Sequence, residues 1–319
     1  MKTVCAALAA FAFSAAAVAQ TYPTGPVRLI APASPGGNID VTARILAPAL
    51  AQILGQPFVV ENKRGAGGMI GADAALKAEP DGHTLMMGTS STLSVGPNVY
   101  KKWPVDPVNG ITPIINVQEV PFALVVNAKS PHKSVEDVLK HAKAKPGAMP
   151  MAHAGNGSSN HLVSELFQML TDTKFLFVPY KGGAPAMASL VAGETEAYFD
   201  QASTSVNQIN AGRIRALGVT ANKRFGPMPE VPTFAEAGVK GFDVMNVTGL
   251  VGPAGMPEAV VRRLNEATLK ALQDEKVKQQ LHALGATIVG STPAEFGKWI
   301  REDLARWAKV VKVANVEQQ

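Results

Sequence analysis

Short apolar runs alternate with amphipathic stretches after residue 22, and this alternation constrains the fold more than any other feature of the sequence. Three of the runs have the length and composition of buried strands: Val27–Ala31, Pro57–Val60 and Thr84–Gly88. The stretches between them are predicted to be helices, over residues 39–54 and 65–77. A strand, helix, strand, helix, strand order predicts a largely parallel, twisted sheet covered by helices.

The same alternation restarts near Pro121. The strands predicted in this second unit are Phe122–Val126, Met149–Ala154, Phe175–Pro179, Ala197–Phe199 and Ile214–Val219. Ser134-x-x-Asp137 is a capping-box pattern that begins one of the helices between them. Proline and glycine recur from Pro227 to Pro257, and helices then continue to the C-terminus.

The closing helix begins with a capping box at Thr292 and carries apolar side chains at core spacing from Phe296 to Val311. A helical tail of this kind usually packs back on the first unit, so two lobes are expected. The first lobe comprises residues 20–120 and 240–319, and the second comprises residues 121–239. The predicted fold class is therefore a two-lobed α/β fold, with a mostly parallel sheet flanked by helices in each lobe and a ligand cleft at the hinge between them.

Residues 1–19 have the pattern of a secretory signal peptide. A basic Lys2 precedes an apolar run, and Ala17-Val18-Ala19 supplies the small residues of a cleavage site near Ala19. The apolar run is too short to span a membrane, and a buried N-terminal helix is disfavoured because the segment has no polar face. The one cysteine, Cys5, lies inside this segment, so the mature chain has none. The protein is therefore expected to be exported.

Charge and motifs exclude several classes of function. The formal net charge is +5, but the basic residues are dispersed and form no stripe with aromatic residues, so no nucleic acid partner is expected. The glycine run from Gly65 to Gly71 has Ile70 where a dinucleotide loop has its third glycine. The six histidines show no metal-ligand spacing, and no nucleophile motif is present. We expect no cofactor, no metal and no catalysis.

Two loops rich in glycine and small polar residues each follow a predicted strand and lead into a helix. The first supplies Ser34, Gly36, Gly37, Asn38 and Asp40, and the second supplies Gly155, Asn156, Gly157, Ser158, Ser159 and Asn160. Backbone N–H groups at a helix N-terminus lack partners and carry partial positive charge, so they bind carboxylate or phosphate. Plain N-capping explains either loop alone. Their matching positions in both lobes favour one anion held from two sides.

Other candidate ligand-binding residues end predicted strands, at the edge of the sheet where open α/β folds bind ligands. Thr89 and Ser90 follow the third strand, and Tyr180 and Asp200 end strands of the second unit. An ionised Asp200 in the cleft would repel a second ligand carboxylate, although the residue is equally suited to capping the helix that follows it. His161 is interpreted as a helix-start residue rather than a ligand.

The sequence resembles the Bug (Bordetella uptake gene) family, the periplasmic receptors of tripartite tricarboxylate transporters. The resemblance rests on the order and spacing of short motifs: Tyr22-Pro23, the Pro-Gly-Gly-x-x-Asp-x-x-Ala-Arg run ending at Arg44, Val60-Glu61-Asn62, Pro80-Asp81-Gly82-His83-Thr84-Leu85, Ala154–Ser159, Val178–Gly183 and Phe199-Asp200. Pro229-x-Val231-Pro232-Thr233 and Pro253-Ala254-Gly255 complete the series.

The resemblance implies a type II periplasmic-binding fold that closes on a small organic carboxylate through the two glycine loops. It also implies a periplasmic location and two membrane transporter subunits as partners, and we expect a monomer. This chain departs from the family at Asn38-Ile39, where members often have Gly-Thr, and at Gln201–Ser203. The identity of the carboxylate therefore cannot be transferred. A periplasmic sensor that signals through a membrane kinase, or an enzyme on the same fold, is the alternative function.

Overall fold

The computed structural model describes residues 22–316, so the signal peptide expected at residues 1–19 lies outside the described residues. The first five predicted elements are confirmed. They are β1 (Val27–Ala31), α1 (Asn38–Leu54), β2 (Phe58–Asn62), α2 (Met69–Leu76) after the short 3₁₀ turn η1 (Ala66–Gly68), and β3 (Thr84–Thr89). The π-helix η2 (Ser91–Val95) and α3 (Gly96–Val99) follow directly. Strands β2 and β3 flank β1 in parallel, as the alternation predicts.

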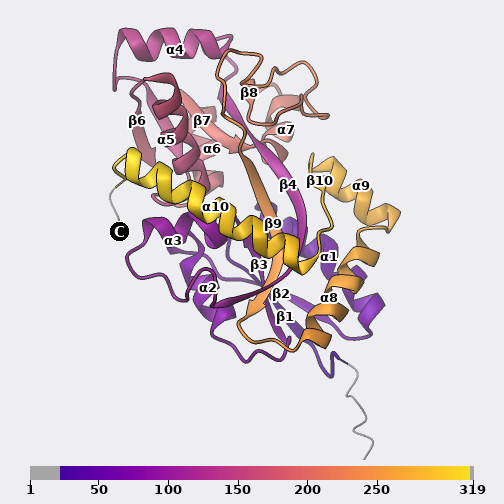
Figure 1. Ribbon diagram of the computed structural model, residues 1–319. Helices are drawn as coiled ribbons and strands as arrows, with labels where there is room; N and C mark the ends of the chain where they lie inside the picture. The colour runs from indigo at the N-terminus through magenta and orange to yellow at the C-terminus, as the bar shows by residue number, and fades with distance from the viewer. Residues whose placement is uncertain (1–21, 317–319) are drawn as a thin grey trace, which may run out of the picture.

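The strand β4 (Ile111–Asn127) is far longer than the strand predicted at its C-terminal end. Its first part pairs with β9 (Met245–Pro253), and Pro121 is the last residue of this pairing, opposite Met245. From Phe122 onward it pairs instead with β7 (Ala197–Gln201) and β8 (Ile214–Val219). One strand of 17 residues thus belongs to both halves of the molecule, and Figure 1 shows β4 and β9 running side by side through its middle.

The second half of the chain contains the remaining elements. They are α4 (Val135–Ala144), β5 (Pro150–His153), α5 (Ser159–Thr171), β6 (Leu176–Pro179), α6 (Gly183–Ala192), β7 (Ala197–Gln201), α7 (Ala202–Asn210), β8 (Ile214–Val219), α8 (Glu258–Ala271), α9 (Glu275–Ala283), β10 (Thr287–Ile288) and α10 (Pro293–Val313). Capping boxes begin α4 at Ser134 and α10 at Thr292, as predicted. Apart from β4, which begins eleven residues before the predicted Phe122, each predicted strand of the second unit is present within two residues of its expected bounds.

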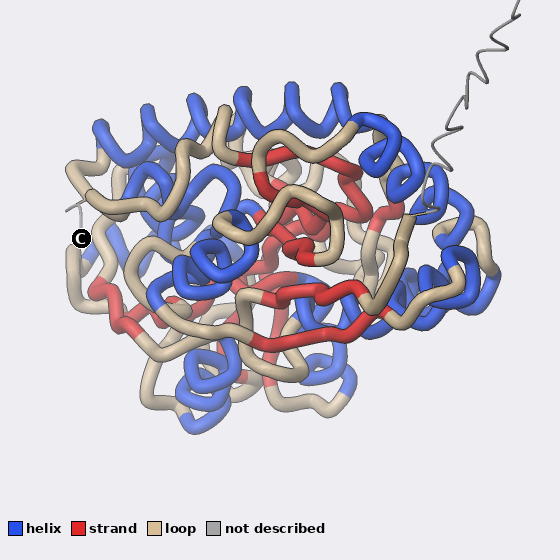
Figure 2. The backbone as a smooth tube through the Cα atoms, turned by 90° about the horizontal axis from the view of Figure 1, so that it is seen from below, coloured by secondary structure: helices blue, strands red, loops and turns tan. Residues whose placement is uncertain are grey.

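The strand order is β2-β1-β3-β9-β4-β7-β5-β6, with β8 pairing to the C-terminal end of β4 and β10 pairing to its middle, at Gln118 and Glu119. The outer strands pair in parallel, but every pair that includes β4 or β9 is antiparallel. Both halves are therefore mixed sheets rather than mostly parallel ones. Figure 2 shows the strands inside and the helices around them. We call the part built around β1, β2, β3 and β9 the first lobe, and the part built around β5 to β8 the second lobe.

The last helix, α10, packs on both lobes and not only on the first. Phe296 and Ile300 belong to the apolar cluster that contains Ile30 of β1. Trp307 instead joins the cluster of the second lobe that contains Phe167. A helix of 21 residues is about 31 Å long. Because its apolar stripe continues over that length, α10 crosses the junction of the lobes, as Figure 1 shows.

Within residues 22–316, no helix combines the length and the hydropathy that a bilayer crossing requires.

Candidate functional site

A cavity of about 1240 Å³ is lined by residues of both lobes. Twelve of the fifteen predicted site residues line it: Ser34, Gly36, Gly37, Asn38, Thr89, Gly155, Asn156, Ser158, Ser159, Asn160, Tyr180 and Asp200. The remaining three, Asp40, Ser90 and Gly157, do not. The structure thus brings the two glycine loops, the end of β3 and the end of β7 to one place.

The N-terminus of α1 faces this cavity without a side-chain cap. Its N-cap is Gly37, which has no side chain to accept a hydrogen bond, so Asn38 is the first helical residue and not the cap. The backbone N–H groups of Asn38, Ile39 and Asp40 find no acceptor among the described residues. Because these groups carry the positive end of the helix dipole, they form an open anion-binding position.

Asp40 shapes the first loop from behind and does not face the cavity. Its Oδ2 atom accepts the backbone N–H of Gly36 at 2.8 Å, and its Oδ1 atom accepts Arg44 Nε and Asn62 Nδ2, each at 2.9 Å. Asn62 also donates to the carbonyl oxygen of Ala33 at 3.2 Å. Burial raises the pKa of Asp40, but the donors Arg44, Gly36 and Asn62 outweigh it and the pKa is lowered. The charged carboxylate therefore fixes the loop.

The N-terminus of α5 lies on the opposite side of the cavity and is partly capped. Ser158 is the N-cap, and its Oγ accepts the N–H of His161 at 3.3 Å. The N–H of Ser159 donates to Ser91 Oγ of the first lobe at 3.2 Å. The N–H of Asn160 has no acceptor among the described residues, while its side chain donates to the carbonyl oxygen of Phe199 at 2.6 Å. One free donor therefore remains here.

Ser90 and Gly157 hold the walls of the cavity rather than lining it. The Oγ of Ser90 accepts the N–H of Val247 at 3.1 Å, which ties the end of β3 to β9. Gly157 has a φ of +72°, and a Cβ built there would lie 2.9 Å from Val99 Cγ1 and 3.0 Å from Tyr100 Cε2. The second loop therefore passes close against α3 of the first lobe.

Asp200 lies in the cavity lining and also holds the first turn of α7, through two hydroxyl groups rather than as the N-cap of its backbone N–H groups. Its Oδ2 atom accepts Thr204 Oγ1 at 2.7 Å and Ser205 Oγ at 2.9 Å. The side chain is almost fully buried. Burial raises the pKa of Asp200 to about 6, although the hydrogen bonds from Thr204 and Ser205 lower it. Its charge therefore changes near neutral pH.

His161 is buried in the first turn of α5 and does not line the cavity, in keeping with its interpretation as a helix-start residue. Its ring stacks on that of His153 with centroids 4.4 Å apart. Burial, with a contribution from His161, lowers the pKa of His153 to about 4.

The comparisons with known proteins agree with this geometry. The family model described as "Tripartite tricarboxylate transporter family receptor" matches residues 42–316. The chain belongs to this receptor family. It is a solute-binding receptor, since the family consists of transporter-binding receptors and not of enzymes.

Relatives of known sequence or structure are similar over nearly their whole length. The protein BugT of Bordetella pertussis is 37% identical over 92% of this chain and 90% of its own. The solved periplasmic binding protein BugD is 32% identical, with a TM-score of 0.87 over 93% of this chain and 100% of its own. The resemblance to the Bug family and the expected α/β periplasmic-binding fold are therefore confirmed.

Two further structures are complexes from Rhodopseudomonas palustris. A protein solved with adipate is 34% identical, with a TM-score of 0.87 over 92% of this chain and 98% of its own. The protein MatC, solved with malate, is 32% identical, with a TM-score of 0.86 over 91% of this chain and 100% of its own.

The receptor's cavity contains residues that sequence reasoning missed. Arg64 and Arg213, which no sequence pattern singles out, bring basic side chains to its lining, and Lys181 beside Tyr180 adds a third. The glycine run that begins at Gly65 also lines it. Its residues Gly65 to Gly68 belong to the lining, whereas Gly71 lies so close to Pro32 that a Cβ there would meet Pro32 Cβ at 2.6 Å. A basic residue beside a glycine run, as at Arg64, is the signal that could have indicated a ligand site.

Buried polar atoms without partners also line the cavity. They include Thr89 Oγ1 on the first lobe, and Gln201 Oε1 and Gln208 Oε1 on the second. A buried polar atom without a hydrogen bond costs about 1–3 kcal/mol, so such atoms indicate a place for a polar ligand or water.

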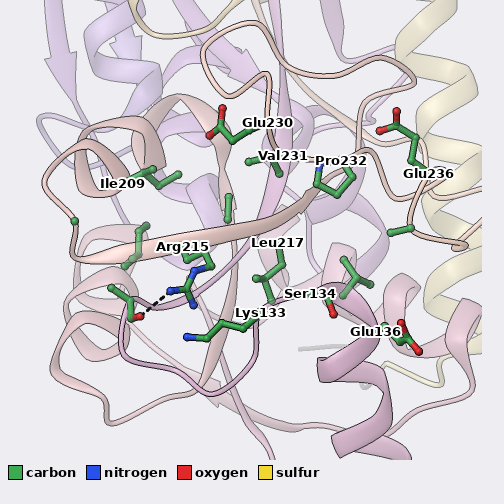
Figure 3. A pocket seen from close by; sticks show the side chains of 16 residues that line it. Lys133, Ser134, Glu136, Ile209, Arg215, Leu217, Glu230, Val231, Pro232 and Glu236 are labelled. Carbon is green, nitrogen blue, oxygen red and sulfur yellow. Dashed lines mark hydrogen bonds between the residues drawn. The ribbon is translucent and has the colours of Figure 1, made fainter.

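A second cavity, of about 730 Å³, lies within the second lobe and is shown in Figure 3. Its walls come from β8, the start of α4 and the segment around Val231, and none of the predicted site residues lines it. The lining side chains carry charges of both signs, from Lys133 and Arg215 and from Glu136, Glu230 and Glu236. Arg215 is already bound to the carbonyl oxygens of Ala128 and His132. The interlobe cavity is therefore the candidate ligand site.

Proposed function

We propose that the protein captures a small mono- or dicarboxylate in the interlobe cavity. In this proposal it works in the periplasm and delivers the ligand to the membrane subunits of a tripartite tricarboxylate transporter. The observation that carries the proposal is the uncapped N-terminus of α1, which aims three free backbone N–H groups at a cavity that α5 closes from the other lobe. One ligand carboxylate binds between these two helix ends.

The charges of the lining support an anionic ligand. Arg64, Lys181 and Arg213 are cationic, and Asp200 is the acidic side chain among the lining residues. Helix N-termini supply the close, directional contacts, and the basic side chains add a longer-range attraction. A ligand with a second carboxylate reaches the basic residues, whereas an amine on the ligand is drawn to Asp200.

The relatives support the same class of ligand. Adipate and malate, bound by the two R. palustris proteins, are both small dicarboxylates. Export, a periplasmic location and delivery to membrane subunits follow from the signal-peptide pattern together with the family.

A carboxylate panel with neutral counterparts tests the proposal. Thermal shift and calorimetry are run on the mature chain with malate, adipate, shorter monocarboxylates and the diamide of adipic acid. A ligand with low-micromolar Kd stabilises the fold by about 2.7 kcal/mol at a hundredfold excess over Kd. The carboxylates are expected to stabilise the protein and the diamide is not. If no carboxylate raises the melting temperature, the proposal fails.

A matched pair of variants at Ser34 tests the position of the carboxylate. Ser34→Asp places a fixed negative charge beside the free N–H groups of α1, where it competes with the ligand and repels it. Ser34→Asn introduces a side chain of nearly the same size as aspartate but without its charge. Ser34→Asp is expected to abolish binding while Ser34→Asn retains it. Equal affinities of the two variants would place the carboxylate elsewhere.

A further inference from the structure

A cluster of two histidines and one glutamate lies in the second lobe, outside both cavities. His132 is in the loop between β4 and α4, His141 is on α4, and Glu196 precedes β7. One ligand atom of each residue lies within 4.8 Å of the other two. The sequence spacing of these residues matches no metal motif, since the tertiary fold alone brings them together.

His132 supplies the observation that distinguishes this cluster from an ordinary group of polar side chains. His132 is only 7% exposed, and its Nε2 atom has no hydrogen-bond partner among the described residues. That atom lies 3.6 Å from Glu196 Oε2, which is too long for a hydrogen bond. A buried imidazole nitrogen left unpaired costs free energy unless something binds it.

The backbone holds His132 in this position from both sides. Its N–H donates to Ser130 Oγ at 3.2 Å, and its carbonyl oxygen accepts Arg215 Nη1 at 3.4 Å. The ring of His141 approaches the ring of His132 edge-on, with centroids 5.1 Å apart. Glu196 is anchored by its N–H, which donates to the carbonyl oxygen of Pro150 at 2.9 Å. The three side chains therefore come from three separately fixed segments.

We propose that His132, His141 and Glu196 bind one divalent transition-metal ion, with zinc as the best match. Zinc takes imidazole nitrogen and carboxylate oxygen at about 2.0–2.2 Å, so neighbouring ligand atoms in a tetrahedral site lie about 3.4 Å apart. The separation of 3.6 Å between His132 Nε2 and Glu196 Oε2 is already close to this value. His141 and Glu196 are partly exposed, so rotation of their side chains can shorten the remaining distances between ligand atoms from at most 4.8 Å to this value. A water molecule is the fourth ligand.

The metal joins the loop after β4, helix α4 and the turn before β7. Figure 1 places α4 at the outer end of the second lobe, and none of the three residues lines the interlobe cavity. The site therefore stabilises the second lobe without taking part in solute binding, so its test is independent of the proposed function. Because binding requires the folded arrangement, zinc raises the free energy of unfolding.

Isothermal titration of the EDTA-treated mature chain with zinc chloride tests the proposal. One zinc per chain is expected. His132→Ala, His141→Ala and Glu196→Gln are each expected to weaken zinc binding at least about tenfold, since loss of an outer-shell partner alone costs 10–100-fold. His132 is buried, so His132→Ala can also impair folding. His141 and Glu196 are partly exposed, so His141→Ala and Glu196→Gln test zinc binding without that complication.

His282→Ala is the matched control, because His282 lies exposed on α9 and outside the cluster. It is expected to bind zinc as the wild type does. Cobalt(II) gives a second readout, since a four-coordinate site produces visible absorption that the three cluster variants lose. The proposal is overturned if the wild type binds no zinc, or if zinc affinity is unchanged in His141→Ala and Glu196→Gln.

Discussion

Ser91 Oγ lies 2.9 Å from Ser159 Oγ and also accepts the backbone N–H of Ser159 at 3.2 Å. Ser91 belongs to η2 of the first lobe, and Ser159 is the first residue of α5 in the second. A hydroxyl of one lobe thus caps the helix of the other. Because this contact bridges the two lobes, we expect it to link lobe closure to the electrostatics of the ligand site.

Ser91→Ala is expected to weaken carboxylate binding. The variant removes an interlobe hydrogen bond worth about 0.5–1.5 kcal/mol, which corresponds to a loss of affinity of roughly two- to tenfold when the closed form binds the ligand. Calorimetry with the tightest-binding carboxylate of the panel measures this loss of affinity. Ser189→Ala is the control, because Ser189 bonds only within its own lobe, to Ala186 and Thr195. Equal Kd values for wild type and Ser91→Ala contradict the link.

Gly157→Ala is expected to impair closure of the lobes. Its added Cβ would lie 2.9 Å from Val99 Cγ1 across the junction. Gly147→Ala is a close control, since Gly147 has nearly the same positive φ, +73°, and nothing within 4 Å of its Cβ. Both variants lose about 1–2 kcal/mol of stability from the left-handed backbone. Only Gly157→Ala is expected to lower ligand affinity. A fall in affinity for both variants, or for neither, argues against the interlobe clash.

Sequence reasoning found both glycine loops because their signals are local. Glycine and small polar residues after a strand indicate a helix N-terminus wherever the strand lies, and Gly37 and Ser158 do begin α1 and α5. The direction of a side chain is not local. Asp40 was predicted to face the ligand, but it turns to Asn62, 22 residues away in the sequence, and holds the loop instead.

The strands that join the lobes were harder to predict. β4 is interrupted by Pro113 and Pro121, so only its last residues had the composition of a strand. β9 contains Gly249, Gly252 and Pro253 in a region where glycine and proline indicated turns. Gly249 is needed because a Cβ there would meet Phe296 of α10 at 2.4 Å. The glycines of β9 are required by tertiary packing, which a local sequence pattern does not indicate.

Asp40→Asn is expected to lower the free energy of unfolding by about 1.5–3 kcal/mol at pH 7, since the carboxylate accepts three hydrogen bonds in a buried position. The folded-state pKa of Asp40 is lowered below 3.8. Its stabilisation is therefore complete above that value and is lost as the pH falls through the lowered pKa. Urea unfolding of both proteins at pH 7 and in acid measures this, and the difference between them should shrink in acid. A constant difference would refute the role of the charge.

Asp200→Asn is expected to stabilise the fold relative to the wild type at pH 7.5 but less at pH 5. Burial raises the pKa of Asp200 from 3.8 to about 6, so the folded state holds the proton more tightly than the unfolded state does. The free energy of unfolding then falls as the pH rises through this window. The difference between variant and wild type should change by about 1.4 kcal/mol between pH 5 and pH 7.5. Urea unfolding at both pH values measures the change, and no change would show that Asp200 titrates normally.

Asp200 is also expected to make dicarboxylate binding depend on pH. Above about pH 6 its carboxylate is ionised and repels a second ligand carboxylate, and below that pH the repulsion is lost. Wild-type affinity for a dicarboxylate should therefore rise several-fold as the pH falls from 7.5 to 5.5. In Asp200→Asn the repulsion is absent, so the variant binds dicarboxylates more tightly at pH 7.5 and its affinity depends less on pH.

A monocarboxylate of similar length is the control, because it lacks the second charge. Calorimetry of both proteins with both ligands at both pH values measures the eight affinities, and an unchanged ranking of mono- and dicarboxylates in Asp200→Asn would show that the second charge binds away from Asp200.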